Sequence, residues 1–414
     1  MEQEKKRDFE NIWAPALVSY TDWVIREALS LKVHKLYFLA RDGWLVYKIA
    51  RRMTEQGKLP LECRYLEGSR YAWRMAEFYL PDADPVEKIC VGGVHVTLRK
   101  MLRRGGLDQA ESEEVARHLG KQKELDRVLS YADTQRMKPI LSECGIFMQL
   151  LHRHAEEAYH STIRYLKQEG VLEQDAFAIV DSGWIGSLQQ TLEHLRQSAT
   201  GSAGSPIHGF YFGLYELPEN VVPAIYHTYY FRPYKDIEKK VRFNNCLFEA
   251  VCSAKEGMTV GYREEDGRIL PVYETDQNPN SERMIRNELC LDRLLEQPDS
   301  VKSLIQPRKE VQRRLEGLMS RPMANDVMEY GDYLFSDDVS ESSLQPVAAI
   351  LDNREIRNLH AVRRLLIMKG IKKETLKDSA WPEGSVARAG KAVGCHMFHI
   401  RMYKRLVYIR KKFK

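Results

Sequence analysis

Residues 35–53 read KLYFLARDGWLVYKIARRM, an apolar run followed by a short charged loop and an amphipathic stretch. The apolar run is typical of a buried strand, and the later apolar residues recur at helical spacing. We therefore predict a strand over residues 35–40 and a helix over about 44–56. The loop between them contains Arg41, Asp42 and Gly43.

The same pattern occurs again at residues 176–195, AFAIVDSGWIGSLQQTLEHL. An apolar strand ends at Asp181, passes through small residues and continues as a helix. Strands that are followed directly by helices indicate a parallel sheet with crossover helices. We expect the two loops to meet, because ligands of such sheets bind beyond the carboxyl ends of the strands.

The sequence divides into four parts. The predicted α/β core comprises residues 1–83 and 171–275, including a helix over 14–31, a strand in IHGFYFGLY (207–215) and a hairpin turning at Asp266-Gly267. Residues 84–170 are expected to form a helical insertion, and residues 276–395 a largely helical C-terminal part. Residues 396–414 form a basic amphipathic tail.

The composition excludes several classes of protein. The 414 residues are 43% hydrophobic and 29% charged with a net charge of +5, which is typical of a globular chain and too balanced to indicate nucleic-acid binding. No apolar run approaches the roughly 20 residues that span a bilayer. The charged N-terminus lacks a signal core, and the seven cysteines form no CxxC pair. We therefore expect a cytoplasmic protein.

The second loop, DSGWIGS at 181–187, suits a sugar phosphate. Backbone N–H groups at the start of a helix attract anions, and Ser182 and Ser187 add hydroxyl groups there. Gly183 and Gly186 permit close approach of the backbone, and Asp181 accepts hydrogen bonds from sugar hydroxyls. A plain capped turn is the alternative interpretation.

The first loop places Arg41 beside Asp42, where a simple turn needs only one capping residue. An arginine forms a charge-assisted fork with pyrophosphate, and Asp42 is a candidate ligand of Mg²⁺ through water. A local surface ion pair is the alternative. Phosphoribosyl pyrophosphate carries phosphates at both ends of a sugar and suits the two loops. Type I phosphoribosyltransferases resemble this arrangement, although their second loop more often has two acids and Thr-Gly-x-Thr.

A closer resemblance covers most of the chain. The segments that carry it are YFLARDG (37–43), YLEGSRYAW (65–73), VDSGWIGSLQ (180–189), FEAVCSAKEGMTVGY (248–262) and DSAWPEG (378–384). They resemble a glycan phosphoribosyltransferase-like domain of bacterial polysaccharide loci, which is often fused to a haloacid-dehalogenase-like phosphatase. The implied fold is α/β, a type I phosphoribosyltransferase-like (Rossmann-like) parallel sheet with a helical insertion and an α+β C-terminal part.

The resemblance implies an enzyme that transfers 5-phosphoribose from phosphoribosyl pyrophosphate to a glycan hydroxyl with Mg²⁺, releasing pyrophosphate. A partner phosphatase would then remove the 5-phosphate, leaving ribofuranose in a capsule or O-antigen. The expected catalytic residues are Arg41, Asp42 and Asp181, with either acid as the base. The donor site adds Gly43, Arg70, Ser182, Gly183, Gly186 and Ser187. A cis peptide bond near Ala40–Arg41 is also implied.

Two other functions remain open. A non-catalytic subunit that binds glycan or nucleotide is favoured by the single acid at position 181. A haloacid-dehalogenase-like phosphatase is suggested by DADPV (82–86) and GDYLFSDD (331–338), but neither motif follows an apolar strand, as a nucleophilic aspartate requires.

The tail, HMFHIRMYKRLVYIRKKFK at 396–414, has seven Lys and Arg residues and no acid. A basic amphipathic helix binds anionic membrane surfaces, and contact with the inner membrane face would suit a lipid-linked acceptor. The alternative is that its apolar face packs on the domain.

Overall fold

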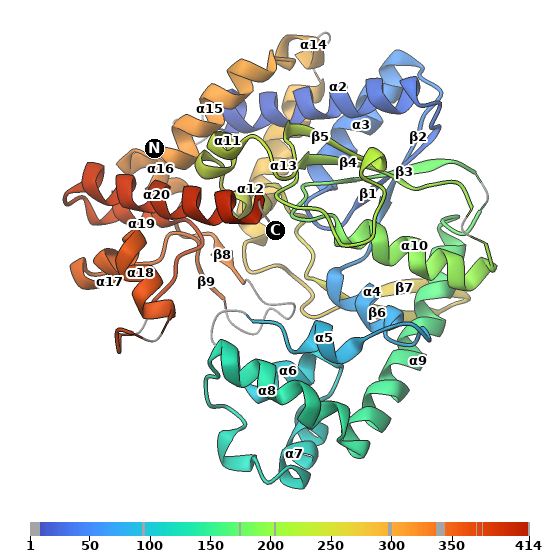
Figure 1. The fold of residues 1–414 in the computed structure, drawn as a ribbon. Helices are drawn as coiled ribbons and strands as arrows, with labels where there is room; N and C mark the ends of the chain where they lie inside the picture. Colours follow the sequence, from blue (N-terminus) through green and yellow to red (C-terminus); the bar gives the residue numbers. More distant parts are fainter. Residues whose placement is uncertain are drawn as a thin grey trace.

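The computed structural model describes residues 9–92, 96–173, 175–202, 204–296, 300–336, 344–369, 371–374 and 376–412. At its centre is a sheet of five parallel strands in the order β2-β1-β3-β4-β5 (Figure 1). The strands are β1 (Lys35–Leu39), β2 (Glu62–Leu66), β3 (Phe177–Asp181), β4 (His208–Gly213) and β5 (Tyr226–Phe231). This arrangement is consistent with the expected Rossmann-like α/β fold.

The sheet is buried on both faces, which explains why its strands are continuous apolar runs. Along β1, Leu36 and Phe38 pack into one core, whereas Tyr37 and Leu39 pack into another. The first core is covered by these elements: η1 (Phe9–Trp13), α2 (Ala14–Ser30), α3 (Trp44–Gly57), α11 (Ile237–Arg242), α12 (Asn245–Cys252), α13 (Ser281–Glu296), α14 (Ser300–Leu304), α15 (Arg308–Ser320) and α16 (Ala324–Tyr330). The second is covered by α4 (Arg70–Glu77), α9 (Gly145–Gln168) and α10 (Ser187–Thr200).

Both strand-to-helix crossings have the expected form. β1 ends at Leu39, one residue earlier than predicted, and α3 starts at Trp44 as predicted. The expected helix over 14–31 is α2, with Leu17, Tyr20 and Val24 fully buried, although Leu31 beyond its end is 39% exposed.

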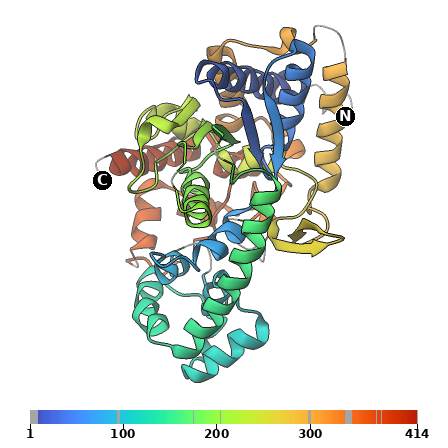
Figure 2. The same ribbon diagram turned by 90° about the vertical axis from the view of Figure 1, so that its right-hand side faces the viewer.

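Residues 85–92 and 96–142 form a helical lobe whose hydrophobic core includes Met101 and Leu102 together with Phe147 of α9. Its elements are α5 (Pro85–Ile89), α6 (Leu98–Arg104), α7 (Gln109–His118), η2 (Gln122–Glu124) and α8 (Tyr131–Ser142). Figure 2 shows α9 running from this lobe back to the sheet. The chain thus leaves the core after α4 and returns to it through α9.

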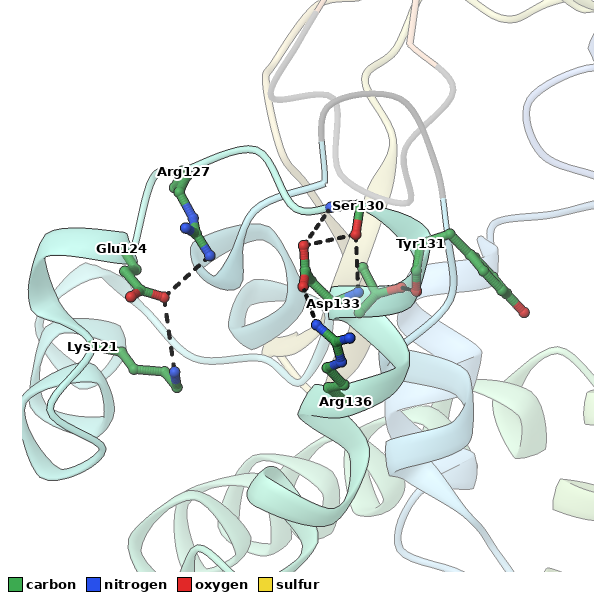
Figure 3. Close-up of polar contacts among 8 residues, drawn as sticks. Lys121, Glu124, Arg127, Ser130, Tyr131, Asp133 and Arg136 are labelled. Carbon is green, nitrogen blue, oxygen red and sulfur yellow. Dashed lines mark hydrogen bonds and ion pairs between the residues drawn. The ribbon is translucent and has the colours of Figure 1, made fainter. Parts of the chain in front are cut away.

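The lobe has well-defined helix ends, as Figure 3 shows for α8. The Asp133 carboxylate accepts from the backbone N–H of Ser130 at 3.2 Å, and the Ser130 hydroxyl accepts from the backbone N–H of Asp133 at 3.1 Å. Arg136 forms an ion pair with Asp133 at 3.1 Å, and Glu124 lies 3.4 Å from Arg127 and 3.8 Å from Lys121. The reciprocal hydrogen bonds between Ser130 and Asp133 form a capping box, which sets the start of α8.

The predicted hairpin is present as the antiparallel pair β6 (Thr259–Glu265) and β7 (Arg268–Tyr273). Asp266 and Gly267, the two turn residues, both have positive φ, which a two-residue hairpin turn of this kind requires. The hairpin packs on α4 and α9, and Tyr262 stacks on Tyr165 with ring centroids 4.3 Å apart. A short helical turn, η3 (Pro223–Ile225), precedes β5.

The C-terminal part adds further helices and one very short strand pair. Its elements are β8 (Leu334–Phe335), β9 (Gln345–Pro346), α17 (Asn353–Asn358), α18 (Ala361–Met368), α19 (Pro382–Ala389) and α20 (Val393–Lys412). Within the described ranges, no helix is both long and apolar enough to cross a membrane.

The basic tail is helix α20, and it packs along α11, α18 and α19. Met397 and Ile400 are buried, and Arg405 forms a two-fold ion pair with Glu238 at 2.6 and 2.8 Å. Lys404 forms an ion pair with the buried carboxylate of Glu383 at 2.7 Å. The structure therefore has the tail docked on the domain as far as residue 412, the last one described there.

Candidate active site

The loop after β1 follows the carboxyl end of the strand and turns sharply into α3. The peptide bond between Ala40 and Arg41 is cis, as the resemblance implies. A Cβ atom on Gly43 would lie 2.5 Å from the carbonyl oxygen of Leu39, so the tight turn requires glycine. The carbonyl oxygen of Arg41 accepts from the backbone N–H of Ala254 at 3.1 Å, which ties this loop to the segment after α12.

The loop after β3 lies beside it, because β1 and β3 are neighbours in the sheet. The Ser182 hydroxyl donates to the Asp42 carboxylate at 2.5 Å and links the two loops directly. The Tyr20 hydroxyl donates a hydrogen bond to the carbonyl oxygen of Asp181 at 3.0 Å, and this bond holds the end of β3 in place. The strand order changes direction between β1 and β3, and ligands of doubly wound sheets bind at such a point.

The glycines of the second loop are explained by packing. Gly183 and Gly186 have φ of +86° and +72°, which favour glycine. A Cβ on Gly183 would lie 2.5 Å from the carbonyl oxygen of Gly213, and one on Gly186 would lie 2.7 Å from the Tyr226 ring. The fold therefore needs both glycines, whatever the loop binds.

A third loop, between β2 and α4, contributes Ser69 and Arg70. The Ser69 side chain caps α4 by accepting from the backbone N–H of Ala72 at 3.0 Å. The exposed Arg70 begins the helix, and Arg74 lies one turn further along the same face.

A carboxylate from outside the three loops completes the site. Glu249 lies on α12 and accepts hydrogen bonds from the indole N–H of Trp184 and from the side-chain amide of Asn245, the latter at 2.7 Å. Neighbouring apolar residues of α12 are buried in the core. One helix therefore both packs on the sheet and presents an acid to the site.

These loops line a cavity of about 220 Å³ at the carboxyl end of the sheet. Seven of the predicted site residues line it: Arg41, Asp42, Arg70, Asp181, Ser182, Gly186 and Ser187. Gly43 and Gly183 lie in the same loops but are absent from the cavity wall. The wall also contains Arg74, Glu249, Asn278 and Asn280, which had not been predicted as site residues.

The three carboxylates of the cavity affect one another. Burial raises the pKa of Asp42, while the Ser182 hydrogen bond and then Arg41 and Arg70 lower it. Burial and then the charge of Asp42 raise the pKa of Asp181 to about 7. Burial, followed by the charges of Asp42 and Asp181, also raises the pKa of Glu249 well above its usual range. Such perturbed acids in a cleft are typical of functional sites.

Arginines of the cavity wall partly offset this acidic cluster. Arg70 lowers the pKa of all three carboxylates. Burial and then the charge of Arg70 lower the pKa of Arg74. The cavity wall therefore combines three arginines, Arg41, Arg70 and Arg74, with carboxylates from the β1 loop, the β3 loop and α12.

The phosphatase-like motif DADPV lies away from the cavity, whereas Leu334, Phe335 and Ser336 of GDYLFSDD belong to its wall. Asp84 of DADPV accepts from the backbone N–H of Glu87 at 3.0 Å and serves as the N-cap of α5 in the helical lobe. In GDYLFSDD, Asp332 forms an ion pair with Arg388 at 2.6 Å, and residues 337 and 338 lie outside the described residues. Asp84 therefore does not stand at the end of a strand, the position that a phosphatase nucleophile needs.

The acids of the cavity are compatible with a magnesium ion. Mg²⁺ is usually held by one or two carboxylates together with substrate phosphates and waters. Asp42 and Asp181 supply carboxylates close enough for the charge of one to raise the pKa of the other, an interaction that a dication relieves. No group of three or more His, Cys, Asp or Glu residues among those described forms a metal site of its own.

Comparison with protein-family models gives no match for this chain, and comparison with curated proteins gives none either.

Proposed function

We propose that this chain is a glycan phosphoribosyltransferase with a type I phosphoribosyltransferase-like sheet. It would move 5-phosphoribose from phosphoribosyl pyrophosphate to a hydroxyl of a bacterial polysaccharide and release pyrophosphate. The main supporting observation is the meeting of the β1 and β3 loops in one cavity, joined by the hydrogen bond from Ser182 to Asp42.

The two ends of the cavity suit the two ends of this donor. Arg41, Arg70 and Arg74 supply cations for the pyrophosphate. At the other end, α10 starts at Ser187 without a side-chain cap, so its first N–H groups and the Ser187 hydroxyl are available to the 5-phosphate. Asp181 also lines the cavity and would accept hydrogen bonds from the ribose hydroxyls.

In the proposed reaction, the bond from C1 of ribose to pyrophosphate breaks and C1 forms a bond to the acceptor oxygen. Positive charge develops on the ribose ring and negative charge on the leaving pyrophosphate, which Arg41 stabilises. The acceptor proton passes to Asp42 or Asp181, whose raised pKa values suit a general base. Attack opposite an α-pyrophosphate gives a β-ribofuranoside.

Asp42, through water, would hold Mg²⁺ together with the donor. When bound, the ion would neutralise charge on the pyrophosphate as it leaves. A partner phosphatase would then remove the 5-phosphate from the product. The setting that this implies is the cytoplasmic side of the membrane where capsule or O-antigen is assembled.

The second candidate is a non-catalytic subunit that binds the same ligands. It was suggested by the single acid at position 181, where related loops more often have two. In the folded chain, Asp42 and Glu249 bring two further carboxylates to the cavity that Asp181 lines. These two acids would take the place of the one that is missing from the sequence motif, which supports the enzyme.

Isothermal titration of the full chain with phosphoribosyl pyrophosphate and Mg²⁺ tests the donor site. We expect binding by the wild type, and binding about tenfold weaker for Ser187→Ala because a buried phosphate contact is lost. The control is Ser198→Ala. Ser198 lies on the same helix and contacts Tyr159 at 3.0 Å, so this variant should bind the donor normally. Absence of binding by the wild type would contradict the proposal.

A further inference from the structure

A second cavity, of about 240 Å³, adjoins the first one. Trp184 and Phe335 belong to the walls of both, so the two spaces are separated by these side chains. The far wall of the second cavity is formed by the C-terminal helices, including Ile400, Tyr403 and Tyr408 of α20. The docked tail therefore encloses a space beside the proposed donor site.

Several aromatic rings line this cavity. Tyr215 is 8% exposed and packs against Trp184 with ring centroids 5.6 Å apart. On its other side it stacks on Tyr408 at 5.4 Å, with the two rings inclined by 26°. Tyr403, five residues before Tyr408 on α20, also lines the cavity, and the Arg364 guanidinium lies 4.4 Å from its ring centroid.

The charges of the cavity are already paired within the protein. Arg364 forms an ion pair with Asp378 at 2.7 Å, and Lys404 pairs with the buried carboxylate of Glu383 at 2.7 Å. The cavity thus combines aromatic faces with polar edges and has no uncompensated charge among these four groups. A phosphate or a carboxylate would have to break one of these pairs, whereas a neutral ligand would not.

We propose that this second cavity binds a neutral pyranose unit of a glycan, and, resting on the proposed function, that it is the acceptor subsite. A pyranose ring has apolar C–H faces that pack on aromatic rings, and a rim of hydroxyls that hydrogen-bond to polar side chains. Apolar and aromatic walls with a few placed polar groups are typical of such ligand sites.

The junction of the two cavities supports this assignment. Trp184 is 39% exposed and donates its indole N–H to Glu249, a residue of the first cavity. Asn245 lines the second cavity and donates to the same carboxylate at 2.7 Å. A sugar in the second cavity would therefore lie one side chain away from Glu249, which lines the first cavity together with Asp42 and Asp181.

Saturation-transfer NMR of the full chain with methyl glucopyranoside, galactopyranoside, mannopyranoside and N-acetylglucosaminide tests the inference. We expect at least one to bind, with signals strongest for ring C–H protons. Tyr403→Ala should weaken that binding about tenfold because an aromatic contact is lost. Tyr403→Phe keeps the ring and should bind as the wild type does.

The matched control is Phe398→Ala, which removes a 59% exposed ring of α20 outside the cavity and should leave binding unchanged. Circular dichroism checks that each variant is folded. Binding of no pyranoside by the wild type, or equal binding by folded Tyr403→Ala, would overturn the inference.

Titration of Tyr403→Ala with phosphoribosyl pyrophosphate separates this inference from the proposed function. Donor affinity should equal that of the wild type, because Tyr403 is not part of the first cavity. Pyranoside binding without any donor binding would support a sugar site and contradict the transferase. Donor binding without pyranoside binding would support the donor site of the transferase and contradict the sugar site.

Discussion

The two adjoining cavities differ in how their charges are compensated. In the first, burial raises the pKa values of Asp42, Asp181 and Glu249, the charge of Asp42 raises the latter two further, and arginines only partly offset this. In the second, charged side chains form close ion pairs such as Arg364 with Asp378. A ligand that relieves the repulsion between the acids of the first cavity therefore gains electrostatic free energy. A ligand of the second cavity has no such gain.

This difference indicates what each cavity is suited to bind. A site of mutually repelling carboxylates facing arginines gains from a ligand that carries both phosphate and a metal ion. A site with paired charges and aromatic walls gains mainly from burial of apolar surface. The following predictions test whether the two cavities really behave in these different ways.

The largest effect is expected for the acids of the first cavity. Asp181→Asn and Asp42→Asn should each lower the transfer rate by roughly 10²–10⁴-fold, the usual contribution of a general base. The rate is measured as release of pyrophosphate in the presence of a glycan acceptor. Asp84→Asn removes an aspartate of the helical lobe that only caps α5 and should leave the rate unchanged. Full activity of both site variants would remove these acids from the mechanism.

The two arginines should differ. Arg41→Ala should lower the rate by about 10²–10³-fold, because Arg41 is half-buried in the loop that would face the leaving group. Arg70 is exposed, where charge interactions are weaker, so Arg70→Ala should cost only about tenfold. Steady-state kinetics of both variants give the order. The opposite order would assign the leaving-group cation to the β2 loop.

The repulsion in the first cavity should also appear as a pH dependence of stability. Asp181 has its pKa raised from 3.8 to about 7, so folding favours its protonated form. The free energy of unfolding should therefore fall as the pH rises from about 4 to 7, and Asp181→Asn should remove this loss. At pH 8 the variant should melt above the wild type, by roughly 2–4 °C per kcal/mol relieved. An equal or lower melting temperature would contradict the electrostatic contrast.

The smallest effect is expected where charges are paired near the surface. Arg405→Ala breaks the ion pair with Glu238, which should cost less than about 1 kcal/mol of unfolding free energy because both side chains are partly exposed.

Deletion of residues 393–414 should instead lower the melting temperature clearly, since it uncovers Tyr215. Thermal melts of both variants test this, with vesicle sedimentation alongside. Vesicle binding that is lost on deletion without a change in melting would favour a membrane role for the tail.

Much of the sheet follows from local patterns. Buried parallel strands are continuous apolar runs, so β1 and β3 were found from KLYFL and FAIVD, and the hairpin from Asp266-Gly267. Loops that follow neighbouring parallel strands must meet, which is why Asp42 and Asp181 were predicted at one site. Their convergence on a single cavity is observed, whereas their roles in binding and catalysis remain predictions.

The rest of the site depends on tertiary packing. Glu249 reaches the cavity because α12 packs on the sheet, and no spacing in the sequence links it to Asp42, more than 200 residues earlier. Arg74 had a signal, since it lies four residues after Arg70 and a helix places both on one face. The wall of the second cavity comes from the segment after β4 and from the C-terminal helices. Because these are far apart in the sequence, no local pattern predicts the cavity.

The most direct test of the central claim is a transfer assay read by mass spectrometry. The full chain is incubated with phosphoribosyl pyrophosphate, Mg²⁺ and a panel of glycan acceptors, with Asp181→Asn as the inactive control. The account predicts that one acceptor gains a single phosphopentose in the wild-type reaction alone. Tight binding of the donor without transfer to any acceptor in the panel would contradict it and favour a non-catalytic binding subunit.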